Sequence, residues 1–377
     1  MSEVLNAVSS DILDSLAGIG PNSPLAAARQ TRDAATRHTQ GSYDAIFTAD
    51  TEEDSALPLS LRFWLAEKIT LLQQDEILQR FYADRLADFP APTLTPALQR
   101  AQAWVERLTT APVSASPEQL HDLQQAGWSA KDIVTLSQLV AFVNFQSRLL
   151  RGYRLIAGRD VKTHPALSAV AGSWHTQSQT HSGKAAPQAF TQAELGWEPW
   201  LSAKPLAEFN EEEQAILARF GHTDSDYFRL LGRNLPVLEQ RTLTDKGIFY
   251  TPGGLPRKER ELVAAVTSKV NGCIFCASVH ARKASQLSKQ TEDVQRLLDV
   301  APGDELGQGQ SPRWQAIIDF SARLSATPAL ADAHDLARLR EQGLDTLEIV
   351  DVVQSAAFFS WANRLMLTLG EPFWPES

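Results

Sequence analysis

The sequence predicts an all-α protein built from two tandem helical-bundle domains that are related by an internal duplication. Three observations support this fold class. Apolar residues recur at helical spacing from Leu57 to Ile156 and again after Gln192, a pattern typical of amphipathic helices. No run of residues shows a convincing alternation of apolar and polar side chains, which would indicate a strand. The second half of the chain also repeats the pattern of the first.

The first predicted domain covers residues 1–157. Residues 1 to about 55 contain only short helical patterns, and the longer helical segments that follow read LRFWLAEKITLL, DEILQRFYADRL, LQRAQAWVERL, PEQLHDLQQAG and AKDIVTLSQLVAFVNFQSRLL. Ser116 and Ser129 each precede an acidic residue in the next turn, as expected for helix N-caps. We predict that the preceding helix ends at Gly127.

A polar connection rich in Ser, Thr and Gly covers residues 158–189. Its composition and weak periodicity predict a linker between two domains. His164, His175 and His181 lie in it, but their spacing does not match a regular set of metal ligands. We therefore expect loop histidines that are exposed to solvent, and no metal site.

Residues 190–377 repeat the first domain. At an offset of 216 residues, the segment RLTTAP that begins at Arg107 matches RLSATP, which begins at Arg323. Further upstream the offset is 198 residues, and Arg62 matches Arg260. Turn residues are shared as well as apolar ones, so the pattern predicts the duplication of one helical domain.

The only two cysteines, Cys273 and Cys276, stand in the segment ELVAAVTSKVNGCIFCASVH. The Asn-Gly pair before Cys273 is a turn signal, so we predict that one helix ends near Val270 and another begins at Cys273. Cys273, Cys276 and His280 then share a helix face, because they are three and four residues apart. The first turn of a helix favours a thiolate, and a nearby imidazole adds to this effect. The pattern indicates a nucleophilic thiol or a dithiol redox pair.

The first domain lacks this chemistry. At the offset of 198 residues, Glu261 corresponds to Phe63, Cys273 to Asp75, Cys276 to Leu78 and His280 to Tyr82. We therefore expect the first domain to serve in packing, in subunit assembly or in shaping the pocket of the second domain.

The pattern Glu261-x11-Cys273-x2-Cys276-x3-His280 resembles the active-site signature of the alkylhydroperoxidase D and carboxymuconolactone decarboxylase superfamily. The second domain resembles the peroxidase-related branch, and the first resembles a degenerate copy. The resemblance implies an all-helical bundle that forms trimers or other homo-oligomers. It also implies that Cys276 attacks a peroxide, that Cys273 resolves the sulfenic acid as a disulfide, and that His280 with Glu261 relays protons.

The same resemblance implies a thiol-dependent peroxidase that uses a thiol or dithiol as electron donor and needs no haem, flavin or metal cofactor. One position departs from the best-studied branch. Phe275 stands where that branch has a histidine immediately before the second cysteine. This change removes one member of the relay and favours an apolar substrate.

Other interpretations of these residues stay open at this point. Cys273, Cys276, His280 and Glu261 could form a structural zinc site, although a closed zinc site normally has four clear ligands. The two thiols could also be an inert structural pair. The alternative functions are a decarboxylase or lactone-processing enzyme, which the other branch of the superfamily suggests, and a non-catalytic assembly protein.

The composition narrows the class of protein. The net charge of −10 argues against a nucleic-acid or anionic-membrane partner. The N-terminal residues carry no basic region typical of a secretory signal, and no apolar run approaches the length of a membrane span. Two cysteines in 377 residues do not make a disulfide framework, so we expect a cytoplasmic protein. The run Phe358-Phe359-Ser360-Trp361 is expected in the core, with pocket lining as the alternative.

Overall fold

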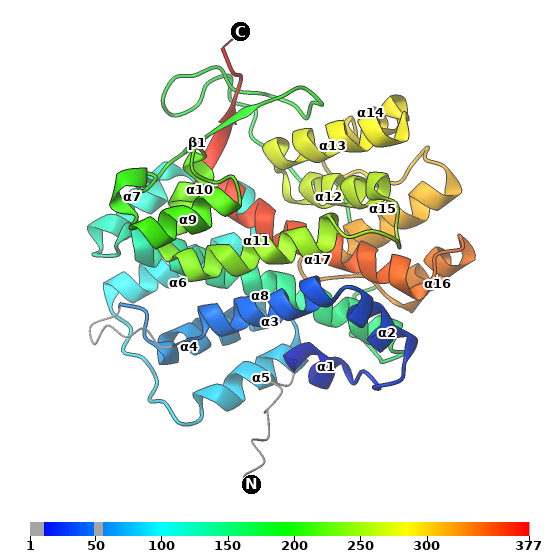
Figure 1. The fold of residues 1–377 in the computed structure, drawn as a ribbon, viewed down its shortest axis with the longest axis horizontal. Coiled ribbons are helices and arrows are strands. Elements are labelled where there is room, and N and C mark those ends of the chain that lie inside the picture. The colour runs from blue at the N-terminus through cyan, green and yellow to red at the C-terminus, as the bar shows by residue number, and fades with distance from the viewer. Residues whose placement is uncertain (1–10, 49–55, 377) are drawn as a thin grey trace.

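The computed structural model describes residues 11–48 and 56–376, which adopt the predicted all-α fold (Figure 1). The helices are α1 (Ile12–Ala17), α2 (Pro24–Thr31), α3 (Asp33–Ile46), α4 (Leu59–Leu72), α5 (Glu76–Leu86), α6 (Pro96–Thr110), α7 (Pro117–Gln125), α8 (Ala130–Ile156), α9 (Glu211–Arg219), α10 (Asp226–Leu231), α11 (Leu235–Phe249), α12 (Arg257–Asn271), α13 (Ile274–Ser288), α14 (Thr291–Leu298), α15 (Pro312–Ser325), α16 (Ala333–Glu341) and α17 (Thr346–Thr368). The described residues also form the short 3-10 turns η1 (Pro112–Ser114), η2 (Leu206–Glu208) and η3 (Gly232–Asn234) and the short strands β1 (Gly196–Pro199) and β2 (Gly370–Phe373).

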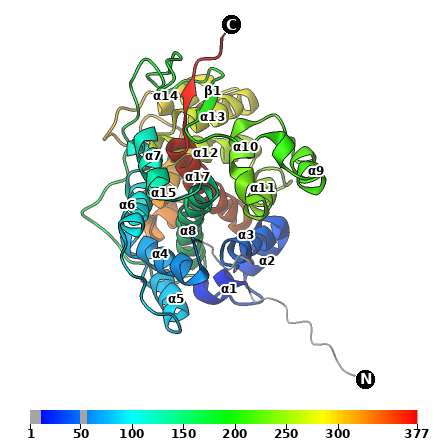
Figure 2. The same ribbon diagram turned by 90° about the vertical axis from the view of Figure 1, so that its left-hand side faces the viewer.

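The long helices α8 and α17 lie side by side at the centre, surrounded by the other helices (Figure 2). Their aromatic side chains meet across this contact, with ring centroids 5.4 Å apart for Phe142 and Trp361 and 6.2 Å apart for Phe145 and Phe358. By length and composition alone α8 could cross a membrane, but its most apolar window is completely buried inside the protein. We therefore interpret α8 as a core helix.

Local capping explains where the helices around the core begin. The Ser129 hydroxyl accepts a hydrogen bond from the Asp132 amide, and the Asp132 carboxylate accepts one from the Ser129 amide, both at 3.0 Å. This reciprocal capping box satisfies amides that α8 leaves unpaired at its start. Gly127 has φ 98°, a left-handed conformation that ends the preceding helix. The predicted cap at Ser129 and the predicted stop at Gly127 are confirmed.

The offsets seen in the sequence reappear as matching elements. The order α4, α5, α6, α7, α8 of the first half corresponds to α12, α13, α15, α16, α17 of the second. Arg62 and Arg260 each donate a hydrogen bond from Nε to the carbonyl five residues earlier, at 2.8 Å in both halves. Phe142 and Phe358 stand at equivalent positions of the two central helices. These correspondences support the duplication.

Contacts also cross between the two halves along much of their length. α3 lies along α11, and α2 packs against α17. Arg148 on α8 donates to the Ser325 carbonyl at 3.4 Å, and its counterpart Arg364 on α17 donates to the Thr109 carbonyl at 2.9 Å. The halves therefore share a core, and the boundaries at residues 157 and 190 stay predictions from the sequence.

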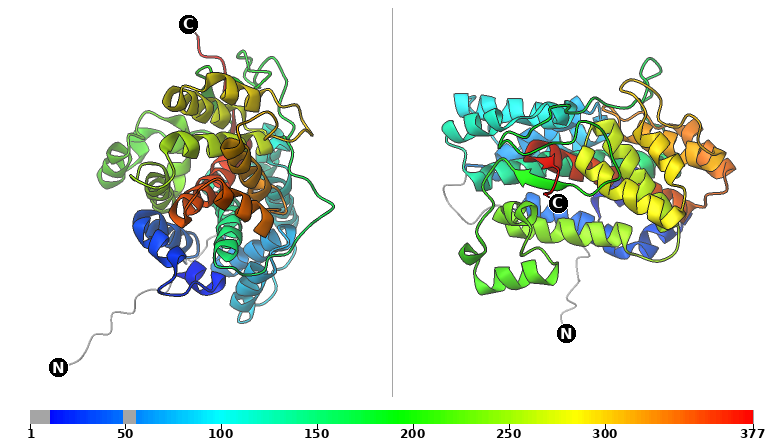
Figure 3. Two further views of the ribbon diagram at one scale, coloured as in Figure 1. Left: turned by 90° about the vertical axis from the view of Figure 1, so that its right-hand side faces the viewer. Right: turned by 90° about the horizontal axis from the view of Figure 1, so that it is seen from above.

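The connection from α8 to β1 contains no helix and passes over the second half of the chain (Figure 3). It is held there by backbone hydrogen bonds, such as the one from the Gly172 amide to the Lys269 carbonyl at 3.0 Å. β1 then pairs antiparallel with β2, with Gly196 opposite Phe373. The sequence did not reveal this ribbon, because each four-residue strand contains a proline and shows no clear alternation.

Candidate active site

The turn between α12 and α13 places both cysteines as the sequence predicts. α12 ends at Asn271, Cys273 is the N-cap of α13, and Cys276 lies in the first turn. Gly272 has φ 78°, and a Cβ atom there would lie 2.1 Å from the carbonyl oxygen of Ser173 in the linker. Only glycine meets both demands, so this residue allows the sharp turn and the close approach of the linker.

The two thiols lie together and are nearly inaccessible. Cys273 is 2% exposed and Cys276 is 5% exposed, both are free cysteines, and their side chains are hydrogen-bonded to each other. The hydrogen bond means that little movement is needed to join the two sulfur atoms in a disulfide.

The surroundings make the two thiols unequal. Burial, followed by the hydrogen bond with Cys276, raises the pKa of Cys273 well above its usual value. Burial acts in the same direction on Cys276, but the hydrogen bond from Cys273, the charge of His280 and smaller effects together outweigh it and lower the pKa of Cys276. Of the two, Cys276 is therefore the thiol that ionises first, as a nucleophile requires.

His280 and Glu261 form the predicted pair. His280 Nδ1 is hydrogen-bonded to Glu261 Oε2, and Arg257 Nε donates to the other carboxylate oxygen at 2.6 Å. Burial opposes the charged form of each group, but their mutual attraction raises the pKa of His280 and lowers that of Glu261. Glu261 is 2% exposed and His280 is 20% exposed by side chain, so the imidazole is the member of the pair that reaches solvent.

Three further polar residues surround Cys276, and none of them was predicted from the sequence. Asn363 on α17 forms a hydrogen bond with the Cys276 thiol, and the charge of Arg241 on α11 favours its thiolate. Asp245, one turn after Arg241, lies near His280, and burial raises its pKa. A polar Asn inside the apolar run of α17 was a usable signal for Asn363, but Arg241 and Asp245 come from a helix that has no motif.

A cavity of about 150 Å³ adjoins Cys276 and His280. Phe249, Phe275, Phe358 and Phe359 supply most of its apolar wall. Its rim includes Tyr250, which is 67% exposed, so the cavity reaches solvent. Within the FFSW run, the core interpretation holds for Trp361, which is fully buried, whereas the two phenylalanines also line this cavity.

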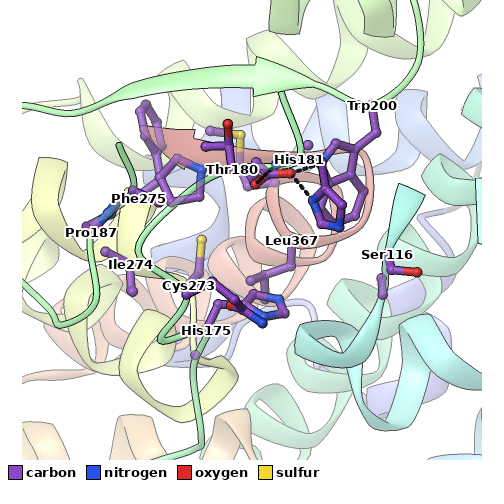
Figure 4. A pocket seen from close by; sticks show the side chains of 18 of the residues that line it. Ser116, His175, Thr180, His181, Pro187, Trp200, Cys273, Ile274, Phe275 and Leu367 are labelled. Atoms are coloured by element: carbon purple, nitrogen blue, oxygen red, sulfur yellow. Dashed lines mark hydrogen bonds and ion pairs between the residues drawn. The ribbon is translucent and has the colours of Figure 1, made fainter. Parts of the chain in front are cut away.

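A second cavity, of about 260 Å³, adjoins Cys273 (Figure 4). Ser114, Ala115 and Ser116 of the first half form one wall, and linker residues between 175 and 187 form another. The sulfur of Cys273 points into this space, and the His175 ring also lines it (Figure 4). We name the two spaces the Cys276 cavity and the Cys273 cavity.

The comparisons with known proteins agree with the motif. Residues 236–303 match the carboxymuconolactone decarboxylase family, and this range contains α12, α13 and both cysteines. Over this segment the chain is similar to the carboxymuconolactone decarboxylase family. The superfamily that the motif resembles is thereby confirmed.

One curated protein and two solved structures are similar to this chain over part of its length. An uncharacterized protein of Bacillus subtilis strain 168, YdfG, is 24% identical over 130 residues, which are 34% of this chain and 86% of that protein. A peroxidase-related protein from Silicibacter sp. TM1040 is 21% identical with a TM-score of 0.38, over 45% of this chain and 92% of its own. An alkylhydroperoxidase AhpD core from Ralstonia eutropha JMP134 is 20% identical with a TM-score of 0.36, over 44% of this chain and 86% of its own.

Neither the linker histidines nor His280 with the two cysteines form a metal-ligand cluster in the described part of the chain. Among residues 11–48 and 56–376, no three His, Cys, Asp or Glu side chains are grouped to hold a metal ion, so the zinc interpretation has no support in the geometry. The expectation that the linker histidines are exposed is wrong for His175, whose Nε2 atom is buried without a hydrogen-bond partner. His181 Nδ1 instead forms a 2.6 Å hydrogen bond with Glu371.

Proposed function

We propose that this protein is a thiol-dependent peroxidase that reduces hydrogen peroxide or a small organic hydroperoxide through Cys273 and Cys276. The observation that carries the proposal is the environment of Cys276. Its thiol is hydrogen-bonded to a second thiol, its pKa is lowered, and it adjoins a cavity that also contains His280. The family match supports an enzymatic role in general terms.

The proposed reaction balances without a cofactor. The Cys276 thiolate attacks one peroxide oxygen, the O–O bond breaks, and Cys276 becomes a sulfenic acid. The departing alkoxide or hydroxide takes a proton from His280, which acts as general acid. The Cys273 thiol then attacks the sulfenic sulfur, a disulfide forms, and water leaves. Two electrons have then passed from the two thiols to the peroxide, and an external thiol restores them by exchange.

Each member of the relay has a structural reason for its role. Glu261 holds the His280 ring through Nδ1, so Nε2 is the nitrogen left free for proton transfer. Arg257 holds Glu261 in turn with a hydrogen bond of 2.6 Å. This chain of contacts favours the protonated form of the imidazole and fixes its orientation.

The walls of the Cys276 cavity favour a small substrate with an apolar group. Its volume of about 150 Å³ has room for hydrogen peroxide or a short alkyl hydroperoxide. Phe275 presents an aromatic wall to the space instead of a further proton donor. We therefore place proton transfer on His280 alone, with Glu261 as its partner.

The test is a peroxide pulse followed by alkylation and mass spectrometry of the peptide that contains both cysteines. We expect a Cys273–Cys276 disulfide that a dithiol reductant reverses, and a sulfenic or sulfinic acid on Cys276 in the Cys273→Ser variant. Val279→Phe places a ring in the Cys276 cavity, where Val279 is half-buried, and should slow oxidation. Two thiols that stay free under peroxide in the folded protein would refute the proposal.

A decarboxylase or lactone-processing activity is the second candidate, because the matched family carries that name. Arg241 offers a buried cation beside the same cavity, which could hold a carboxylate. This chemistry does not need two adjacent thiols. Full turnover of such a substrate by the Cys276→Ser variant would favour it over the peroxidase.

A further inference from the structure

The two sulfur atoms of the proposed redox pair serve different cavities. Cys276 lines one cavity and Cys273 lines the other. Phe275 and Met366 line both, so these two side chains stand between the spaces. A disulfide between Cys273 and Cys276 would therefore be approached from two sides, one for each sulfur.

The Cys273 cavity is built largely by parts of the chain outside the family segment. Its walls include Ser114 to Ser116 at the end of η1, linker residues 175–187, and β2. The Cys276 cavity has no lining residue before Tyr227. The first half and the linker thus line a second space beside the dithiol.

His175 gives this second space a proton acceptor. Its Nε2 atom is buried and has no hydrogen-bond partner among the described residues, although the ring lines the cavity. The ring is hydrogen-bonded to the backbone of Val113, and Nε2 is the ring nitrogen that has no partner among the described residues. Burial lowers the pKa of His175 below its usual value, so the imidazole is neutral near pH 7. The charged or titratable side chains that act on it are Glu371 of β2 and His181 of the linker.

The inequality of the two thiols decides which sulfur of a disulfide is attacked. In thiol–disulfide exchange the thiol with the lower pKa is the better leaving group. The surrounding residues lower the pKa of Cys276, which favours its thiolate, whereas burial and Cys276 raise the pKa of Cys273. An incoming thiol therefore reacts best at Cys273 and releases Cys276, and Cys273 is the sulfur that the second cavity exposes (Figure 4).

We propose that the Cys273 cavity binds a low-molecular-weight thiol that reduces the Cys273–Cys276 disulfide, and that His175 accepts the proton of this thiol. The inference rests on the proposed peroxidase function. The donor sulfur bonds to Cys273, the disulfide breaks, and Cys276 leaves as a thiolate. A second donor thiol then attacks the mixed disulfide, so that two thiols become one disulfide and both cysteines are restored. Two electrons move from the donor to the protein.

The cavity also indicates the kind of thiol. Its volume of about 260 Å³ suits a compact molecule, and its lining is mainly apolar. At the rim the Glu371 carboxylate is already hydrogen-bonded to His181 and to the Trp200 indole, so it is not free to bind a ligand. A small thiol with an uncharged body fits this space, whereas the surface of a folded donor protein does not.

The reduction step can be tested apart from the peroxidase. Diamide oxidises the protein to its disulfide without peroxide, and 2-mercaptoethanol or dithiothreitol then reduces it, with alkylation and mass spectrometry as the readout. Ala186→Phe fills the cavity from the linker side, and Gln177→Trp narrows its exposed rim without entering the core. Each should slow reduction by both probes on the order of tenfold, because the donor loses its positioned approach.

His175→Gln tests the proton acceptor, and His164→Gln in the same linker is the matched control, since His164 lies outside the Cys273 cavity. Loss of a general base should slow reduction near pH 7 by on the order of tenfold or more. The deficit should vanish at a pH above the pKa of the probe thiol, where no proton needs to be removed. A merely structural role of His175 would give a deficit at every pH.

Several results would overturn the inference. If both Ala186→Phe and Gln177→Trp are reduced as fast as the parent protein, the donor thiol does not bind in this cavity. If the rate of reduction of His175→Gln depends on pH in the same way as that of the parent protein, His175 is not the proton acceptor. Fast reduction by a thioredoxin-sized protein dithiol with slow reduction by both small probes would assign the site to a protein donor. If diamide forms the disulfide and peroxide does not, the peroxidase proposal fails while the reduction test still stands.

Discussion

Glu261 Oε2 is hydrogen-bonded to His280 Nδ1, and this carboxylate is 2% exposed. The pair lies beside Cys276, so a change at Glu261 acts on the thiol through the imidazole. The carboxylate raises the pKa of His280, and the charged imidazole lowers that of Cys276. The pKa of the reactive thiol therefore depends on a residue that the thiol does not contact.

The first prediction follows from this relay. Glu261→Gln keeps the shape of the side chain and removes its charge, so the pKa of His280 should fall and the pKa of Cys276 should rise. Oxidation by peroxide at pH 7 should slow by on the order of 100-fold, the scale of a lost general acid. Stopped-flow oxidation as a function of pH measures both effects. The control is Glu239→Gln, which removes a surface partner of Arg219 and should leave the rate unchanged.

The second prediction concerns Arg241, which is 5% exposed and is among the charges that favour the Cys276 thiolate. Arg241→Met keeps the apolar bulk and removes the charge. Alkylation of Cys276 by iodoacetamide at pH 7 should slow about three- to tenfold, because one pKa unit changes the thiolate fraction tenfold. An unchanged pH profile of alkylation would show that the guanidinium does not act on the thiol. Arg229→Met, a partly exposed arginine paired with Asp226, is the matched control.

The third prediction uses Lys269, which is fully buried on α12. Its Nζ donates to the carbonyls of Leu298 and Val300 at 2.9 and 2.7 Å, and burial lowers its pKa from 10.5 to about 8. The folded protein therefore holds fewer protons on this group than the unfolded chain between pH 8 and 10.5, so the contribution of Lys269 to the free energy of unfolding rises with pH in that window.

Urea denaturation at several pH values measures this contribution. Relative to Lys269→Met, the parent should gain about 2 to 3 kcal/mol from pH 8 to pH 10.5, the equivalent of the pKa shift. Taking the difference from the variant cancels the contributions of other groups that titrate in the same pH range. A constant difference between the two proteins across these pH values would contradict the prediction.

Local signals predicted the helical part of this protein well. The Asn-Gly turn, the Ser129 cap and the helical spacing around the cysteines all act within a few residues, and the structure has them where the sequence indicates. The repeat also pointed correctly to matched arginines such as Arg62 and Arg260. Such features depend on neighbours in the chain, which a single sequence displays directly.

The parts that were missed depend on contacts between distant segments. Arg241 and Asn363 reach Cys276 from α11 and α17, and neither stands in a motif. His175 looked like one of three solvated loop histidines, because nothing in its own neighbourhood shows that the linker folds onto the Cys273 turn. The close approach of Ser173 to Gly272, which only glycine allows, is likewise a tertiary feature.

The last prediction tests the duplicated core. Arg148 and Arg364 are fully buried counterparts on the two central helices, and each donates a hydrogen bond to a carbonyl in the opposite half. Replacing either by Met leaves such carbonyls without a donor, which should lower the free energy of unfolding by about 2 to 4 kcal/mol. Arg37→Met, at an exposed ion pair, is the control and should change stability by less than about 1 kcal/mol.

The double variant separates the loss of hydrogen bonds from the relief of repulsion between the two guanidinium groups. Both guanidinium groups approach the Thr327 hydroxyl, at 2.9 and 3.5 Å, and the charge of Arg148 adds to the effect of burial in lowering the pKa of Arg364. Each single change therefore removes hydrogen bonds but also relieves a repulsion, and the second change has no repulsion left to relieve. The loss of stability in Arg148→Met/Arg364→Met should exceed the sum of the two single losses, as a double-mutant cycle measures. A loss equal to or below that sum would mean that the two cations do not repel each other in the folded core.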